Sequence, residues 1–278
     1  MTDSPRTIKS NIEKYRLKNS GKRIPFGVGC AWLSSGYPND REKMQSHQRT
    51  LETAYELGFR YFDTARKYGD SEWVLGEFIA TIPRESIFLA TKFNLPKVSD
   101  PREAARQARG FLNESLERLQ TNRLDLYQIH DSRQMELVFS EGGVLEFLLD
   151  AKRQGLIGHI GMAIRDHPIL EHALDSADFD TILTWGDFSP FNQSGAGLIE
   201  RAARQGMGVI NGSPLYDARQ HRLELGVPQV LGAVLQYPLT NPGIDMTLTG
   251  PSNEQEIRAS VAALHTEIDR GVWEEMQK

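Results

Sequence analysis

The stretch YFDTARKYGDSEWVLG, residues 61–76, carries the pattern that decides the fold. Residues 60–64 form a short apolar run typical of a buried strand, and an apolar helical pattern follows from residue 71. The turn between them carries Asp63 and Tyr68, so a carboxylate and a phenol share one strand-to-helix loop. We expect Ser71 to start the helix, because its hydroxyl can accept from the free backbone N–H groups there.

The same strand-then-helix unit occurs along the rest of the chain. Apolar runs predict eight strands, over residues 26–30, 60–64, 87–93, 124–130, 158–163, 181–184, 208–211 and 246–249. Helical patterns follow near residues 45–58, 71–80, 101–119, 143–154, 167–176, 195–205, 228–237 and 253–263. Eight such units in 278 residues favour an α/β fold, a closed (β/α)8 TIM barrel, over an open doubly wound sheet. We therefore expect one domain over residues 1–278, with residues 1–11 disordered.

Composition excludes several classes of protein. The net charge of −5 and the lack of a Lys/Arg run argue against a nucleic-acid partner. The single cysteine, Cys30, allows neither an intrachain disulfide nor a cluster of thiolate metal ligands, and we expect no metal. No apolar run reaches the roughly 18 residues that a membrane span needs, and the first residues lack an apolar signal region. These features predict a cytoplasmic protein, a monomer or small homo-oligomer, that binds a small molecule.

Four side chains near predicted strand ends form a candidate catalytic group. Asp63, Lys92 and His130 lie at the ends of the second, third and fourth strands, and Tyr68 follows the second. A Tyr normally loses its proton near pH 10, so a Tyr that acts as acid or base at neutral pH needs a cation such as Lys92 beside it. Asp63 is the natural counter-ion of a buried Lys92, and His130 can donate a hydrogen bond to a substrate oxygen. Taken singly, each of the four could equally be structural.

The order of these four residues and the flanking residues YGDSEWVLG resemble the aldo-keto reductases, over about residues 14–273. Residues 181–193, TILTWGDFSPFNQ, and residues 273–276, WEEM, look most like the aldose and L-galactose 1-dehydrogenase branch. The resemblance implies an NAD(P)-dependent oxidoreductase that moves a hydride between nicotinamide and a carbonyl or alcohol of a sugar or sugar-like substrate. In that family Tyr68 would be the general acid/base, and residues 14–25 would form a hairpin that closes the bottom of the barrel.

The resemblance also implies where NAD(H) or NADP(H) would bind, although no GxGxxG turn is present. The implied loops follow the seventh and eighth strands, and their candidate cofactor residues are Gly212, Ser213, Leu215, Gly250, Ser252, Glu256 and Ser260. Glu256 aligns where NADP-using members tend to place a cation, which favours NAD(H), unless it is an ordinary exposed helix residue. Residues 161–164 read GMAI, where family members usually have a Ser-Asn pair for the carboxamide.

Aromatic side chains are the candidates for substrate contact. Trp32 and Tyr37 follow the first strand and Trp185 ends the sixth, although each could also be an ordinary surface aromatic. Two other functions remain open for this barrel. One is a non-catalytic nicotinamide-binding redox sensor or subunit, which the missing Ser-Asn pair favours. The other is an isomerase or epimerase that uses Tyr68 and His130 without net redox chemistry.

Overall fold

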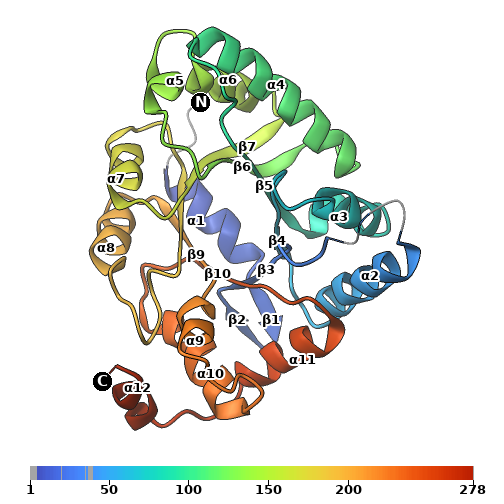
Figure 1. Cartoon of the computed structure of the whole chain (residues 1–278), viewed down its shortest axis with the longest axis vertical. Helices are drawn as coiled ribbons and strands as arrows, with labels where there is room; N and C mark the ends of the chain where they lie inside the picture. The colour runs from blue at the N-terminus through green and yellow to red at the C-terminus, as the bar shows by residue number, and fades with distance from the viewer. Residues whose placement is uncertain (1–4, 20, 35, 37–39, 278) are drawn as a thin grey trace.

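A closed ring of eight parallel strands forms the centre of the molecule (Figure 1). The computed structural model describes the whole chain except residues 1–4, 20, 35, 37–39 and 278. The strands follow one another around the ring in chain order, and the last pairs with the first. They are β3 (Phe26–Gly29), β4 (Tyr61–Asp63), β5 (Phe88–Phe93), β6 (Leu124–His130), β7 (Ile157–Ala163), β8 (Thr181–Trp185), β9 (Gly208–Gly212) and β10 (Met246–Thr249). The predicted TIM barrel is therefore confirmed.

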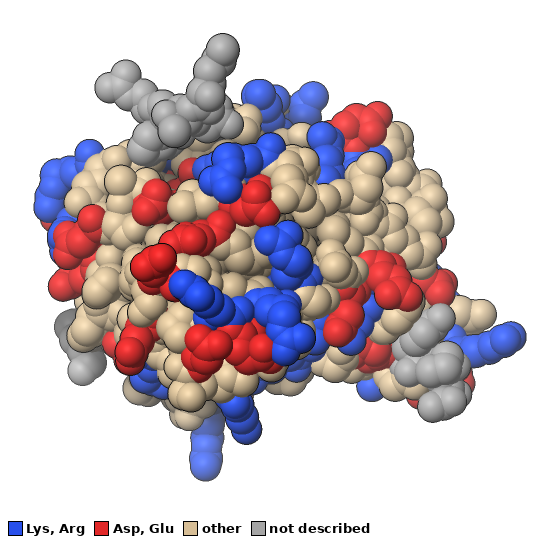
Figure 2. Space-filling view, turned by 90° about the horizontal axis from the view of Figure 1, so that it is seen from above, with Lys and Arg blue, Asp and Glu red and all other residues tan. Residues whose placement is uncertain are grey.

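Helices surround the ring and bury its outer face. One major helix follows each strand: α2 (Arg41–Glu56), α3 (Ser71–Ile79), α4 (Pro101–Arg118), α6 (Val144–Arg153), α7 (His167–Asp175), α8 (Ala196–Arg204), α10 (Pro228–Gln236) and α11 (Glu254–Ala263). Shorter elements that we did not predict are η1 (Arg84–Ser86), α5 (Met135–Phe139), α9 (Tyr216–Gln220), η2 (Tyr237–Thr240) and α12 (Arg270–Met276). On the face shown in Figure 2, Lys and Arg side chains lie among Asp and Glu side chains. None of the helices in the described part of the chain is long and apolar enough to span a bilayer.

Helix α3 begins at Ser71, as predicted, but Ser71 does not cap it. Asp70, not Ser71, occupies the N-cap position. The Ser71 hydroxyl is buried and donates to the backbone oxygen of Cys30 (2.7 Å), with Thr64 Oγ1 at 2.9 Å. Ser71 therefore ties the helix to the ends of β3 and β4. At the other end of α3, a Cβ on Gly76 would lie 2.0 Å from the backbone oxygen of Arg118, so glycine permits the close contact with α4.

The bottom of the barrel is closed by a helix that we did not predict. Residues 5–11, expected to be disordered, belong to α1 (Pro5–Lys14), and residues 1–4 lie outside the described part of the chain. Ile8 and Ile12 are one helical turn apart, and both are buried against the side chains that fill the inside of the ring. Figure 1 shows α1 through the ring of strands. The prediction failed because the segment is polar apart from these two isoleucines, and the side chains that they pack against come together only in the closed barrel.

A short antiparallel hairpin follows α1, as predicted. It consists of β1 (Leu17–Asn19) and β2 (Lys22–Ile24). Leu17 is buried in the main hydrophobic core, and the Lys18 amide donates to the backbone oxygen of Gly58 (3.3 Å). Helix and hairpin together close this end, so the opposite end, where the strands terminate, is the face available for a site.

Candidate active site

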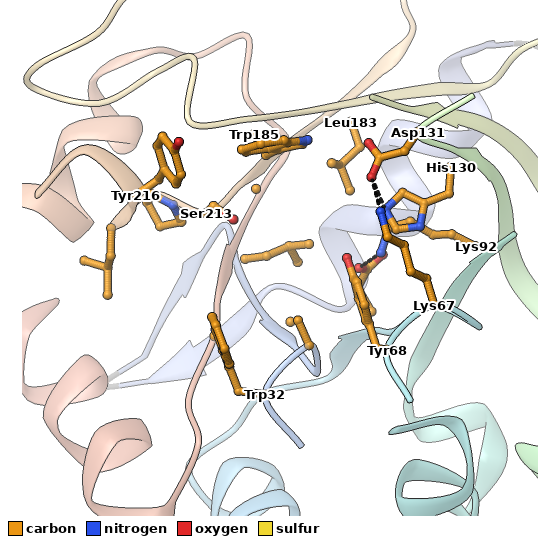
Figure 3. Close-up of a pocket in the computed structure, with 18 of the residues that line it drawn as sticks. Trp32, Lys67, Tyr68, Lys92, His130, Asp131, Leu183, Trp185, Ser213 and Tyr216 are labelled. Atoms are coloured by element: carbon orange, nitrogen blue, oxygen red, sulfur yellow. Dashed lines mark hydrogen bonds and ion pairs between the residues drawn. The ribbon is translucent and has the colours of Figure 1, made fainter. Parts of the chain in front are cut away.

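A cavity of about 490 Å³ opens at the carboxyl ends of the strands (Figure 3). All four catalytic candidates line it, as do both tryptophans proposed for substrate contact and four of the cofactor candidates. These residues are Asp63, Tyr68, Lys92, His130, Trp32, Trp185, Gly212, Ser213, Leu215 and Gly250. The other cofactor candidates, Ser252, Glu256 and Ser260, are not among its lining residues. No group of three or more potential metal-binding side chains is found among the residues that the structure describes.

Asp63 and Lys92 form a buried ion pair at the base of the cavity. Their side chains are only 3% and 2% exposed, so the pair is almost fully removed from water. Lys92 Nζ also donates to the backbone oxygen of Thr64 (2.9 Å), and Gln128 Nε2 donates to the second oxygen of Asp63 (3.1 Å). Burial disfavours the ammonium, but Asp63 and Tyr68 together outweigh this and raise the pKa of Lys92. Lys92 therefore carries a positive charge at neutral pH.

The pairing of neighbouring strands explains why these residues meet. In the β4–β5 register Asp63 lies beside Ala90, two residues before Lys92, and in the β5–β6 register Lys92 lies beside Gln128. Because successive residues in a strand point to opposite faces, positions two apart share the inner face of the barrel. His130, two residues after Gln128, lies on the same side at the end of β6. The spacing of these residues within their strands thus brings their side chains to one site.

Tyr68 lies between the buried cation and the imidazole. Lys92 Nζ is 5.1 Å from the centre of the Tyr68 ring, and the ring meets that of His130 edge to face at 5.6 Å and 89°. Burial raises the pKa of the Tyr68 phenol, and Lys92 opposes part of that rise. The phenol is therefore protonated at neutral pH, with a cation in place to stabilise the phenolate.

His130 is held as a neutral imidazole. Its backbone oxygen accepts from Asn94 Nδ2 (2.9 Å) and from the Ser132 hydroxyl (2.8 Å), which fixes the end of β6. Burial first, and then the charge of Lys92, lower the pKa of His130 to about 3. Nδ1 is buried without a hydrogen-bond partner among the described residues, whereas Nε2 lies 3.6 Å from a carboxylate oxygen of Asp131.

Sequence reasoning missed two charged residues in this part of the cavity. Lys67 precedes Tyr68, Asp131 follows His130, and both line the cavity (Figure 3). Lys67 Nζ lies 3.1 Å from Asp131 Oδ2, which joins the loops after β4 and β6. The signal that could have found them is their position next to two catalytic candidates.

Aromatic and cationic side chains form the other side of the cavity. Trp32 is 58% exposed, and the guanidinium of Arg219 lies 5.8 Å from its ring. Trp185 meets Tyr216 edge to face at 5.5 Å, and Arg165 lies 5.1 Å from both rings. Tyr216, Arg219 and Gln220 of α9 line the cavity, although nothing in the sequence singled them out. Tyr37 lies outside the described residues.

The loops after β9 and β10 contribute backbone to the wall of the cavity. Gly212 and Gly250 line the cavity, and a Cβ on either would lie 3.1 Å or 3.3 Å from a tryptophan side-chain atom. Ser213, which follows Gly212, also lines the cavity and has a left-handed backbone, φ +50°. Backbone N–H groups in loops of this kind can approach phosphate groups closely. That these loops hold the phosphate-bearing part of a nicotinamide dinucleotide stays a prediction.

The remaining cofactor candidates bind one another. Glu256 accepts from the Ser252 amide (2.7 Å) and hydroxyl (3.0 Å), and its own backbone oxygen accepts from the Ser260 hydroxyl (2.9 Å). Ser260 is buried, whereas Glu256 is exposed in the first turn of α11. Ala163 and Ile164, the last residues of the GMAI segment, are buried and apolar, so their side chains offer no hydrogen bond to a carboxamide.

Comparisons with known proteins agree with this geometry. The family model described as the Aldo/keto reductase family matches residues 25–220. L-galactose dehydrogenase of Arabidopsis thaliana is 28% identical over an alignment that covers 94% of this chain and 90% of that protein. D-threo-aldose 1-dehydrogenase of a Pseudomonas species is 25% identical, with 81% and 85% covered. The solved structure of an aldo-keto reductase from Bacillus halodurans, in its holo form, has the same fold, with a TM-score of 0.73, 22% identity and 95% of each chain covered.

Proposed function

The chain belongs to the aldo/keto reductase family, and we propose that it is an NAD(P)-dependent oxidoreductase acting on a carbonyl or alcohol of a sugar or sugar-like substrate. The observation that carries the proposal is the convergence of Asp63, Tyr68, Lys92 and His130 on one cavity. They supply a proton donor, a buried cation, its counter-ion and a neutral hydrogen-bond donor, which is what proton transfer at a carbonyl oxygen requires.

Each of the four residues has a separate task in this proposal. The Tyr68 phenol gives a proton to the substrate oxygen during reduction, or takes it during oxidation. Lys92 stabilises the phenolate, and Asp63 keeps Lys92 charged and in place. His130, neutral over the physiological range, donates a hydrogen bond to the same oxygen. A nicotinamide dinucleotide bound with its phosphates along Gly212, Ser213 and Gly250 would supply the hydride donor or acceptor.

The substrate class rests on the relatives and on the lining of the cavity. Two proteins similar to this chain over most of its length are named L-galactose dehydrogenase and D-threo-aldose 1-dehydrogenase. The cavity offers aromatic surfaces at Trp32 and Trp185 on one side and the charged groups of Lys67 and Asp131 on the other. A sugar presents apolar C–H faces and polar hydroxyl edges, so it matches both kinds of surface.

For the cofactor, we propose that NAD(H) is preferred over NADP(H). Glu256 supports this preference because its carboxylate stands at the start of α11, beside the Ser252 amide. A 2′-phosphate approaching the same amide would meet a negative charge instead of the cation that NADP-binding sites use. The preference should be several-fold to tens-fold, since the carboxylate is exposed and water screens part of the repulsion.

The proposal is tested by Tyr68→Phe, with Tyr127→Phe as the matched control. Tyr127 is buried on β6 against Phe93 and does not line the cavity. Turnover, followed by nicotinamide absorbance with a panel of aldoses, should fall by roughly 100-fold or more in Tyr68→Phe and stay near normal in the control. Near-normal turnover in Tyr68→Phe would exclude Tyr68 as the acid/base.

The same assay separates two other functions. A redox sensor or subunit is favoured by the apolar Ala163 and Ile164, and it would bind nicotinamide without turning over any aldose. An isomerase or epimerase would convert a sugar without any change in nicotinamide absorbance. Either result would overturn the proposed reaction.

A further inference from the structure

The ion pair of Lys67 and Asp131 is a part of the cavity to which the proposed reaction assigns no role. Both residues line the cavity next to Tyr68 and His130, yet neither is needed to hold the Asp63–Lys92 pair. Their side chains are 56% and 29% exposed, so they face solvent in the cavity and remain accessible to a ligand.

Asp131 keeps its place at the cost of an unfavourable backbone conformation. Its φ is +44°, in the left-handed region that residues other than glycine rarely adopt. The Asp131 amide donates to the backbone oxygen of Ala163 (2.9 Å), and Asn94 and Ser132 bind the preceding carbonyl. Strain of this kind persists where the surroundings fix it, commonly at sites that bind ligands. The turn aims the carboxylate at Lys67 and at the imidazole of His130 (Figure 3).

We assign the hydrogen of His130 to Nε2, next to this carboxylate. A hydrogen on Nδ1 would be a buried donor without a partner, whereas Nε2 faces the cavity and Asp131. The distance of 3.6 Å from Nε2 to Asp131 is too long for a strong hydrogen bond, so the donor stays available for a substrate oxygen. An oxygen bound there has the Asp131 carboxylate as its neighbour.

The chemistry of the pair selects a neutral, hydroxylated group. Lys67 supplies donors and Asp131 supplies acceptors, and at 3.1 Å their charges largely compensate each other. An anionic substrate group would gain from Lys67 but be repelled by Asp131, whereas a hydroxyl both donates and accepts. We propose that Lys67 and Asp131 bind the hydroxyl next to the reacting carbon, so that this chain selects polyhydroxylated substrates. The inference rests on the proposed function for the identity of the reacting carbon.

The test compares a sugar with the analogue that lacks only that hydroxyl. The pairs are L-galactose with 2-deoxy-L-galactose and D-arabinose with 2-deoxy-D-ribose. The variants are Lys67→Met and Asp131→Gly, because glycine accepts the left-handed backbone while it removes the carboxylate. Arg109→Met is the matched control, since Arg109 makes a 3.1 Å ion pair with Asp150 away from the cavity. Both kcat/KM and sugar binding, by tryptophan fluorescence, are measured.

The wild type should prefer the hydroxylated sugar by about tenfold or more in both measurements, because a site built for a hydroxyl discriminates against its absence. Lys67→Met and Asp131→Gly should reduce this preference to within about threefold, because they weaken binding and turnover of the hydroxylated sugar alone. Arg109→Met should leave the preference unchanged. Equal binding of both sugars by the wild type, binding of neither, or an equal loss for both in the variants would overturn the inference. If the ratio of the two sugars' binding affinities depends on Asp131 but no redox turnover is seen, the subsite is supported and the proposed reaction is rejected.

Discussion

Replacing Lys92 by Met tests the buried ion pair directly. The change removes the ammonium but keeps a long apolar side chain, so Asp63 is left at 3% side-chain exposure with Gln128 as its remaining side-chain partner. Removing one partner of a buried pair costs about 3–5 kcal/mol, because the other charge remains desolvated. With an unfolding entropy of about 2.1 cal/mol/K per residue, this loss corresponds to a fall in Tm of about 5–9 °C for a chain of 278 residues.

The pH dependence of that loss identifies its cause. In the wild type, burial already raises the pKa of Asp63 and Lys92 opposes the rise, so removal of Lys92 raises it further. A carboxyl group whose pKa is higher in the folded than in the unfolded protein destabilises the fold. This loss of stability is complete above the folded pKa and disappears as the pH falls below it. The Tm difference between wild type and Lys92→Met should therefore narrow between pH 8 and pH 5, as thermal unfolding by circular dichroism would show.

Two comparisons make the result decisive. Lys67→Met removes the same kind of charge from a solvent-exposed pair and should lower Tm by less than about 2 °C, since such pairs contribute at most about 1 kcal/mol. The double variant Asp63→Asn/Lys92→Met should recover part of the fall in Tm, because no unpaired buried charge remains. A fall in Tm as small as that of Lys67→Met, or one that is independent of pH, would refute the reasoning.

Three further predictions concern His130, Glu256 and Ile12. The pKa of His130 is about 3 in the folded protein and about 6.5 in the unfolded chain, so its contribution to stability is complete above pH 6.5 and is lost as the pH falls towards 3. His130→Gln should therefore flatten the acid side of the profile of Tm against pH, and an unchanged profile would contradict this. Glu256→Arg should narrow or invert the preference for NAD(H), measured as dissociation constants for both cofactors, and tighter binding of NADP(H) by the wild type would show that Glu256 does not set the preference. Ile12→Ala should cost about 2–5 kcal/mol in urea unfolding, because Ile12 is fully buried in the barrel floor; a loss below about 1 kcal/mol would mean that α1 detaches at little cost.

The features that could be predicted from sequence are those encoded by local spacing. Alternating apolar runs and helical patterns gave the eight strands, and residues such as Asp63 and Lys92 could be placed because each lies at a strand end. Contacts between distant segments have no such signature. The packing of Ile12 into the barrel, the pairing of Lys67 with Asp131, and the position of α9 beside the cavity depend on the closed ring. Ser71 shows the same limit, since its hydroxyl binds the end of β3 instead of capping its own helix.

The helix at the bottom of the barrel imposes an order on folding. Asp245, just before β10, forms ion pairs with Lys9 (3.3 Å) and Arg16 (3.9 Å), and the Arg16 contact spans 229 positions of sequence. During synthesis α1 leaves the ribosome long before β10 is made, so Ile8 and Ile12 stay in water until the ring can close around them. Contacts of such long range form slowly, and exposed apolar groups promote association between nascent chains. We therefore expect the segment that seals the finished barrel to be among the last parts of the chain to reach its native contacts.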